Sequence, residues 1–320
     1  MGCKPLPLLI LLTLLTLLLA PTPLLAQLKK VRFAVSAIAI TELPFKIAQL
    51  KGFYRQEGLD VEMILIRGAV GVQALVGGSV DYSSASGALI AAGVRGLGVK
   101  LIFLVSSKPQ FDLVSQPQIR SVQQLKGKVL GISSRGGAVD LLMQLILTKN
   151  GLTPNKDATL LVVGTPEETV MALKAGLISA ALFTPPRQLI LYREGFNQLA
   201  YSGDYMPTYP TGGIGVTEEK IKKEPAEVLS FIKASLKGLQ FYKQNRPESV
   251  EIVSRYLGIK EPALAAQVYD LHAGRLGSSG SADEPWMKGA IEFTQKSLGV
   301  AKEIPPNQVF DFSFVEKALR

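Results

Sequence analysis

Short apolar runs alternate with helical stretches from about residue 30 to residue 183, and this alternation constrains the fold most. Runs such as Val31–Ser36 and Asp60–Ile66 are rich in β-branched residues and are typical of strands. A helix between consecutive strands lets the chain return across the sheet, so we expect parallel pairing and an α/β fold. The expected strands are Val31–Ser36, Asp60–Ile66, Val80–Ser83, Lys100–Val105, Lys128–Ser133, Thr159–Val163 and Ala180–Phe183.

Two segments of this alternating region align with each other without gaps. Residues Ala74–Ser86 and Ala172–Thr184 both read as a helix containing Ala-Leu, a glycine, and a short strand that ends in a hydroxyl residue. Such an internal similarity predicts two lobes built on one plan. Two unrelated strand-helix-strand units could also match by chance, and the sequence leaves both explanations open.

The chain becomes helical after Tyr205 and remains so to its end. Four of the expected helices begin at a proline, which suits the first helical turn because its backbone N–H would be unpaired there. The expected helices are Pro225–Tyr242, Pro247–Leu257, Pro262–Leu271, Pro285–Leu298 and Phe314–Leu319. We interpret this region as part of the folded body and not as a linker.

Residues 1–26 have the layout of a secretory signal peptide. Lys4 precedes an apolar run over Leu6–Leu19, and prolines separate that run from a small residue at Ala26. We therefore expect secretion across the inner membrane, cleavage after Ala26 and a periplasmic product. An uncleaved anchor is the alternative, although the run is shorter than the roughly 20 residues that span a bilayer. Cleavage would remove Cys3, the single cysteine of the chain.

Composition and charge argue against several classes of protein. The formal net charge is +9, but the basic residues are scattered and form no stripe interleaved with aromatics, so we expect no nucleic-acid partner. The single histidine, His272, excludes a histidine cluster, and we interpret it as a half-exposed residue of a helix. No G-x-S-x-G motif or acid pair is present, so we expect no catalytic residue, metal or cofactor. Trp286 is expected to be a packing residue.

Ligands of parallel α/β sheets gather at the carboxyl ends of the strands, where the following helices begin. Hydroxyl residues, glycines and two arginines recur at these ends, and each could equally be a helix cap. Arg67 and Arg135 favour an anionic group, and Glu42 could receive an amine. The candidates taken from the strand ends are Ser36, Ala37, Thr41, Arg67, Gly68, Ser84, Ala85, Ser86, Ser134, Arg135, Gly136, Gly137, Thr184 and Pro185.

The turn over Gly131–Ala138 resembles a phosphate-binding loop but lacks its reactive positions. It keeps both glycines of G-x-x-x-x-G-K-[ST], while Gly137 and Ala138 replace the lysine and the hydroxyl residue. Backbone N–H groups at the start of the next helix would favour negative charge. We therefore predict that the turn holds an anionic or strongly polar group and not a nucleoside triphosphate. A simple helix cap is the alternative.

Tyr205 and Tyr209 lie in a loop rich in proline and glycine, "GDYMPTYPTGG", where the chain would cross between lobes. This position favours side chains that line a cleft, and simple packing within the loop remains open.

Several ordered segments together resemble one family. They are "ELPFKIAQLKGFYRQEGLDVEMI", "VQALVGGSVDYSSAS", "LKGKVLGISSRGG", "NGLTPNKDATLLVVG", "VMALKAGLISAALFTPP" and "FDFSFVEKAL". Over residues 30–320 the chain resembles the solute-binding proteins of ABC importers, in the branch that binds sulfonates, taurine, nitrate and thiamine precursors. The resemblance implies a type II periplasmic binding protein fold, with two Rossmann-like lobes, two crossing strands and a central cleft.

This resemblance also implies boundaries, contacts and partners. One lobe would comprise residues 28–112 and 206–320, and the other residues 113–205. Ligand contacts would come from Ser36–Ile38, Gly68, Ser84–Ser86, Ser134–Ala138 and Thr184–Pro185, which adds Ile38 and Ala138 to the candidates. The partners would be a small-molecule ligand and the permease and ATPase subunits of an ABC importer, with the chain acting as a monomer.

Two other functions remain open at this point. The first is an enzyme on the same fold, such as a pyrimidine-precursor synthase, although the chain lacks the cysteine-containing motif of those enzymes. The second is a signalling component that presents its ligand to a membrane receptor.

Overall fold

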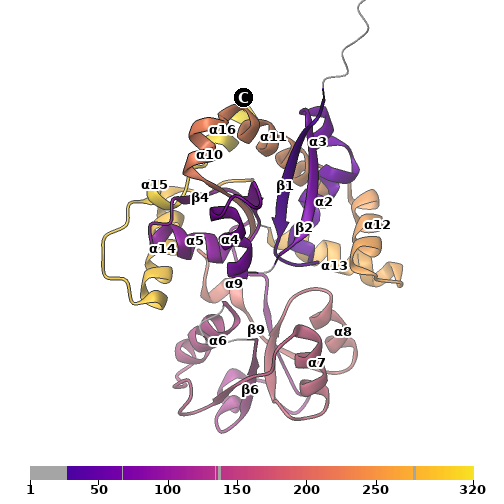
Figure 1. Ribbon diagram of the computed structural model, residues 1–320. Coiled ribbons are helices and arrows are strands. Elements are labelled where there is room, and N and C mark those ends of the chain that lie inside the picture. The colour runs from indigo at the N-terminus through magenta and orange to yellow at the C-terminus, as the bar shows by residue number, and fades with distance from the viewer. Residues whose placement is uncertain (1–26, 67, 134, 136–137, 277–278) are drawn as a thin grey trace, which may run out of the picture.

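The computed structural model describes residues 27–66, 68–133, 135, 138–276 and 279–320. Its strands form two five-stranded sheets, and each sheet is the centre of one of the two bodies in Figure 1. We call the body with the first sheet the large lobe and the body with the second sheet the small lobe. Arg67, Ser134, Gly136 and Gly137 lie outside the described residues, as does the expected signal peptide.

The first sheet has the strand order β2-β1-β3-β10-β4. Strand β1 pairs in parallel with β2 and β3, with Val31 opposite Val61 and Phe33 opposite Tyr82. Strand β10 is antiparallel to both β3 and β4. The strands are β1 (Lys29–Val35), β2 (Leu59–Leu65), β3 (Tyr82–Ser83), β4 (Val99–Ser106) and β10 (Thr211–Thr217).

The second sheet has the order β7-β6-β8-β5-β9, which repeats the first sheet strand for strand. Strand β6 pairs in parallel with β7 and β8, and β5 is antiparallel to β8 and β9. The two aligned segments, Ala74–Ser86 and Ala172–Thr184, occupy matching places in the two sheets. The first ends in β3, which is antiparallel to β10, and the second ends in β8, which is antiparallel to β5. The strands are β5 (Asp112–Ser115), β6 (Val129–Ile132), β7 (Thr159–Val162), β8 (Ala180–Phe183) and β9 (Asn197–Tyr201).

Strands β5 and β10 are antiparallel to their neighbours and were not among the strands expected from the sequence. Strand β10 reads as a loop in the sequence because of its glycines, yet these glycines are required by close packing. A Cβ on Gly213 would lie 2.6 Å from the carbonyl oxygen of Phe103, and one on Gly215 would overlap the side chain of Leu89. Close approach of backbone and helix thus explains a strand that propensity alone does not predict.

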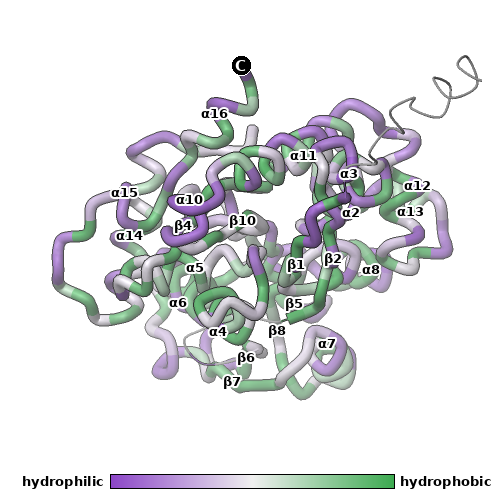
Figure 2. Tube along the Cα trace, turned by 45° about the horizontal axis from the view of Figure 1, so that its top comes forward, coloured by the Kyte–Doolittle hydropathy of each residue, from purple (hydrophilic) through white to green (hydrophobic). Residues whose placement is uncertain are grey.

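Helices cover both sheets, and the C-terminal helices belong to the large lobe. Figure 1 shows α11, α12, α13 and α16 around the first sheet and α6, α7 and α8 around the second. Figure 2 shows that the outer helix α10 is hydrophilic, whereas hydrophobic segments follow the strands. The helices are η1 (Ile40–Glu42), α2 (Leu43–Leu50), α3 (Phe53–Gln56), α4 (Gly68–Val76), α5 (Ser86–Val94), η2 (Val122–Leu125), α6 (Ala138–Lys149), α7 (Pro166–Lys174), α8 (Arg187–Arg193), α9 (Ser202–Tyr205), α10 (Glu218–Lys223), α11 (Pro225–Gln244), α12 (Arg246–Leu257), α13 (Pro262–Arg275), α14 (Glu284–Leu298), α15 (Pro306–Val309) and α16 (Ser313–Leu319).

Phe231 of α11 organises the core of the large lobe. Its ring stacks on Tyr82 at 3.9 Å and on Tyr54 at 5.0 Å, and it meets the edge of Phe33 at 5.3 Å. Large buried rings contribute about 1.5–3 kcal/mol each when they are removed from water, so this cluster fixes α11 on the sheet.

His272 is fully buried, so the interpretation of a half-exposed histidine is wrong. The side chain lies on the same face of α13 as the buried residues Val268 and Tyr269, and its Nδ1 is 2.8 Å from the Tyr242 hydroxyl. Burial, aided by the charge of Arg275, lowers the pKa of His272 to about 3. Trp286 is buried as expected, and its indole N–H donates to the Ser107 carbonyl at 2.8 Å.

The chain passes between the two sheets twice, through residues 107–111 and residues 202–210. The Ser202 hydroxyl ties the two passages together, because it accepts the backbone N–H of Phe111 at 3.1 Å. Among the helices that the structure describes, none combines the length and apolar character needed to cross a bilayer.

Candidate ligand-binding cleft

A cavity of about 690 Å³ lies where the strand ends of the two lobes meet. The large lobe contributes the loops after β1 and β3, and the small lobe contributes the loop after β8 and the start of α6. Eleven of the candidates chosen from the sequence line this cavity: Ser36, Ala37, Thr41, Gly68, Ser84, Ala85, Ser86, Arg135, Ala138, Thr184 and Tyr209. A mostly apolar cavity with a few convergent hydroxyl groups is the usual form of a small-molecule site.

Ile38 and Pro185 line a neighbouring cavity of about 600 Å³. Both cavities include Ser36, Ala37 and Thr184 in their walls, so they are adjoining parts of one cleft. Ile38 is 62% exposed and lies at the open side of this second cavity.

The two tyrosines of the crossing segment differ in their placement. Tyr205 lines neither cavity; its ring packs on the small-lobe core, and its hydroxyl accepts from Asn150 at 3.0 Å. Tyr209 lines the larger cavity, where it meets the edge of Phe293 at 5.7 Å. Its hydroxyl occupies space that Gly87 leaves open, since a Cβ there would lie 2.5 Å from that oxygen. Burial raises the pKa of Tyr209 to about 12 and keeps the hydroxyl neutral.

Ser36 and Ser84 form one hydrogen-bonded pair in the wall of the large lobe. They follow the parallel neighbours β1 and β3, which places both at the same sheet edge. The backbone N–H of Ser36 donates to the Ser84 hydroxyl at 2.9 Å. Both hydroxyls then donate to Oε1 of Glu42, from Ser36 at 2.9 Å and from Ser84 at 2.7 Å.

Glu42 is buried behind this pair and is not part of the cavity wall itself. Burial raises the pKa of Glu42 to about 7, and the hydrogen bonds from Ser84 and Ser36 oppose that rise. Within the described part of the chain, the second carboxylate oxygen, Oε2, accepts no hydrogen bond. The sequence points to Glu42 as a partner of an amine, whereas the structure places two serines at the wall in front of it.

The small-lobe wall carries the arginine that the sequence predicts. Arg135 lines the cavity, but its guanidinium also donates to the Leu160 carbonyl and, at 3.3 Å, to the Asn155 side chain. Arg187, which lines the second cavity, is paired with Glu167. The start of α6 lies beside Arg135 and adds its partial positive charge.

Several lining residues were missed by sequence reasoning. Gln110 and Phe111 lie in the first crossing segment, and Phe293 and Leu298 come from α14. The Gln110 amide donates to Ser106 at 2.8 Å and to the Arg275 carbonyl at 2.9 Å, and its Oε1 has no partner among the residues described. An apolar face on α14 was visible in the sequence, but nothing there indicates that this face meets strand ends 200 residues earlier.

The cleft offers little for covalent or metal chemistry. In residues 27–320, apart from the undescribed positions, no group of three histidine, cysteine, aspartate or glutamate side chains could hold a metal ion. The side chains gathered here offer hydrogen-bonding groups and apolar surface.

Comparisons with known proteins agree with this architecture. Residues 41–249 match the model of the family described as "NMT1/THI5 like". The riboflavin-binding protein RibY of Chloroflexus aurantiacus is 26% identical over 242 residues, which cover 72% of this chain and 67% of that protein.

Solved structures show the same fold at low sequence identity. The periplasmic aliphatic sulphonate binding protein SsuA of Escherichia coli superposes with a TM-score of 0.70 at 18% identity, covering 88% of this chain and 91% of that one. The periplasmic nitrate-binding protein NrtA of Synechocystis PCC 6803 gives a TM-score of 0.71 at 16% identity, covering 91% and 88%. The periplasmic binding protein fold expected from the sequence is therefore confirmed.

Proposed function

The chain belongs to the NMT1/THI5-like family, and from this premise we propose that it is an extracytoplasmic solute-binding protein. It captures a small polar organic molecule, anionic or zwitterionic, and delivers it to the permease of an ABC importer. The observation that carries the proposal is the cavity of about 690 Å³, whose walls come from the strand ends of both lobes. RibY, SsuA and NrtA, the similar proteins described above, are binding proteins, which supports this choice over an enzyme.

The chemistry of the two walls supports a zwitterionic ligand best. The small lobe presents Arg135 and the start of α6, which suit an anionic group. The large lobe presents serine hydroxyls backed by the Glu42 carboxyl group, which suit a group with N–H bonds.

Closure of the lobes around the ligand is the proposed mechanism. A ligand that contacts both walls stabilises the closed arrangement in proportion to its preference for that state. Contacts between the lobes would guide the motion: Arg193 of α8 pairs with Glu261 at 2.6 Å and donates to Gln267 of α13 at 2.9 Å. Arg275 of α13 pairs with the buried Asp112 at 2.9 Å where the first crossing enters β5.

Native mass spectrometry of gently purified protein tests the proposal, because it reveals a molecule that co-purifies with the chain. Adding that molecule at a hundred times its dissociation constant should stabilise the fold by about 2.7 kcal/mol. It should also reduce the radius of gyration in solution scattering. Binding without compaction would contradict closure, and turnover of the molecule would support the enzyme instead.

A further inference from the structure

The hydroxyl hydrogens of Ser36 and Ser84 are already used in hydrogen bonds within the protein. Each serine hydroxyl has one hydrogen to donate and two lone pairs that accept. Ser36 donates to Oε1 of Glu42 at 2.9 Å, and Ser84 donates to the same oxygen at 2.7 Å, with the Ser36 hydroxyl as a longer, second acceptor at 3.3 Å. One Ser84 lone pair accepts the Ser36 N–H, so the pair retains lone pairs but no hydrogen for a group in the cavity.

Gln110 also lines the cavity. Both amide hydrogens are used, by the Ser106 hydroxyl and the Arg275 carbonyl, which fixes the orientation of the side-chain amide. The Gln110 Oε1 is buried and accepts no hydrogen bond from the described residues. The lone pairs of Ser36 and Ser84 form what we call the acceptor wall.

We propose that Glu42 is a positioning residue that turns the Ser36 and Ser84 hydrogens away from the cavity, so that the acceptor wall selects the N–H-bearing end of the captured molecule. This inference rests on the proposed function, because it specifies one end of the ligand. Glu42 acts through the serines and is not itself a wall residue.

The surroundings of Glu42 make this arrangement dependent on pH. The titratable groups that respond to the Glu42 charge are Tyr54 and Tyr256: burial raises their pKa values, the Glu42 charge raises them further, and both phenols stay neutral. Among the described residues, no lysine or arginine forms an ion pair with Glu42. Burial raises the Glu42 pKa to about 7, so the carboxyl is mostly protonated at pH 6 and mostly charged at pH 8, where the charge strengthens the hydrogen bonds from both serines to Oε1. Preference for N–H groups should therefore increase from pH 6 to pH 8.

Two isosteric probes test the selection by calorimetry. 3-Aminopropane-1-sulfonate and butane-1-sulfonate differ only in an ammonium against a methyl group. At pH 8 we expect the amine to bind at least tenfold more tightly, which corresponds to about 1.4 kcal/mol. Glu42→Gln and Ser36→Ala should each reduce this ratio at least fivefold while they change butanesulfonate binding less than threefold.

Glu62→Gln is the matched control, because it makes the same charge change at an exposed position of the same lobe. It should leave the ratio as in the parent. Equal weakening of both probes in Glu42→Gln would mean a structural role and would overturn the proposal.

A second measurement does not depend on any ligand. Neutron diffraction from deuterated crystals at pH 8 locates the hydroxyl deuterium atoms, and both should lie on the lines towards Glu42 Oε1. A deuterium of either serine that points into the cavity overturns the proposal. If neither sulfonate binds, the proposed ligand class fails, while the neutron map still decides the role of Glu42.

Discussion

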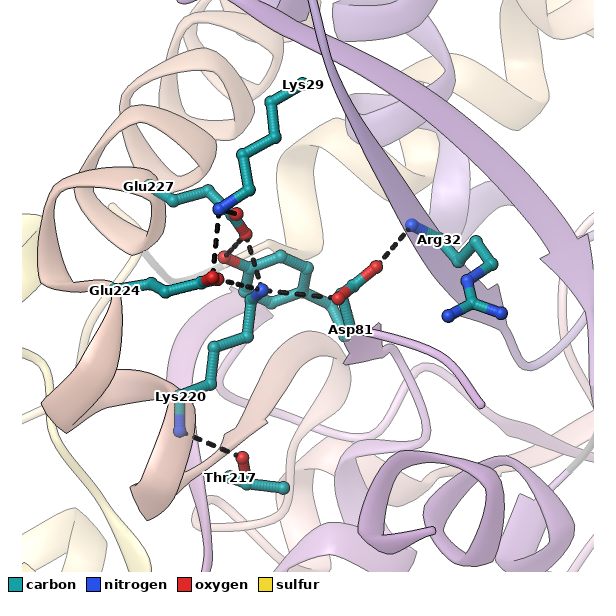
Figure 3. Close-up of polar contacts among 8 residues, drawn as sticks. Lys29, Arg32, Asp81, Thr217, Lys220, Glu224 and Glu227 are labelled. Atoms are coloured by element: carbon teal, nitrogen blue, oxygen red, sulfur yellow. Dashed lines mark hydrogen bonds and ion pairs between the residues drawn. The ribbon is translucent and has the colours of Figure 1, made fainter. Parts of the chain in front are cut away.

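Two buried carboxylates at opposite ends of the first sheet have contrasting surroundings. Glu227 of α11 lies at the amino end, where Lys29 approaches to 2.5 Å, Lys220 to 2.8 Å, and the Tyr82 hydroxyl donates at 3.0 Å. Glu42 lies at the carboxyl end and, as far as the structure describes the chain, receives only two serine hydroxyls. Figure 3 shows the first of these clusters, in which Lys29 and Lys220 lie among Asp81, Glu224 and Glu227.

The difference indicates what each carboxylate does. Lys220 also contacts Glu224 at 2.6 Å and Asp81 at 3.2 Å, and hydrogen bonds from Lys220 and Lys29 lower the Glu224 pKa to about 2. This network joins α10 and α11 to the sheet. A buried charge without such a partner is costly, so its retention beside a cavity favours a role in binding.

Removing Lys220 should produce the largest effect on stability. Lys220→Met leaves the buried Glu227 and the neighbouring acids with one cation fewer, and we expect the free energy of unfolding to fall by about 4 kcal/mol. Chemical denaturation measures this loss. Lys223→Met is the control, since Lys223 pairs with Glu219 on the surface and should change stability by about 0.5 kcal/mol or less. Similar losses in the two variants would remove the contrast between the buried network and the surface.

In contrast to Lys220→Met, Glu42→Gln should raise the free energy of unfolding relative to the parent as the pH rises. The folded-state pKa of about 7 exceeds the ordinary value of 4.5, so this carboxyl stabilises the fold below pH 4.5 and loses that contribution as the pH rises through 7. Relative to the parent, the variant should therefore gain about 3 kcal/mol between pH 4.5 and pH 8. Denaturation curves across this range measure the difference. A constant difference between variant and parent would show that Glu42 does not titrate in this range.

Tyr82→Phe and Ser84→Ala should separate structural from ligand-binding effects, because Tyr82 begins the short strand β3 and Ser84 directly follows it. Tyr82→Phe removes a hydrogen bond to Glu227 and should cost about 1 kcal/mol of stability without weakening ligand binding. Ser84→Ala should reduce the binding of 3-aminopropane-1-sulfonate about fivefold and change stability less. Thermal unfolding and calorimetry on both variants provide the comparison. Loss of binding in Tyr82→Phe would contradict the assignment of the amino end to structure.

Much of the cleft could be predicted from the sequence, because strands and their ends carry local signals. Ser36, Ser84 and Thr184 follow apolar runs directly, and the structure brings them to one cavity. The ion pair between Lys29 and Glu227 could not be predicted from local sequence patterns, because nearly 200 residues separate the two side chains. Strand β10 could not be predicted from the sequence, because its glycines are required by tertiary packing, namely the close approach of α5 and β4. Gln110 likewise gains its importance only from Ser106 and Arg275, which fix its amide.

Calorimetry on Glu42→Gln and Glu227→Gln with 3-aminopropane-1-sulfonate at pH 8 tests most directly whether the two carboxylates differ in function. We predict at least a fivefold loss of affinity in Glu42→Gln and parent-like affinity in folded Glu227→Gln. Unchanged affinity in Glu42→Gln, or equal losses in the two variants, would contradict the account.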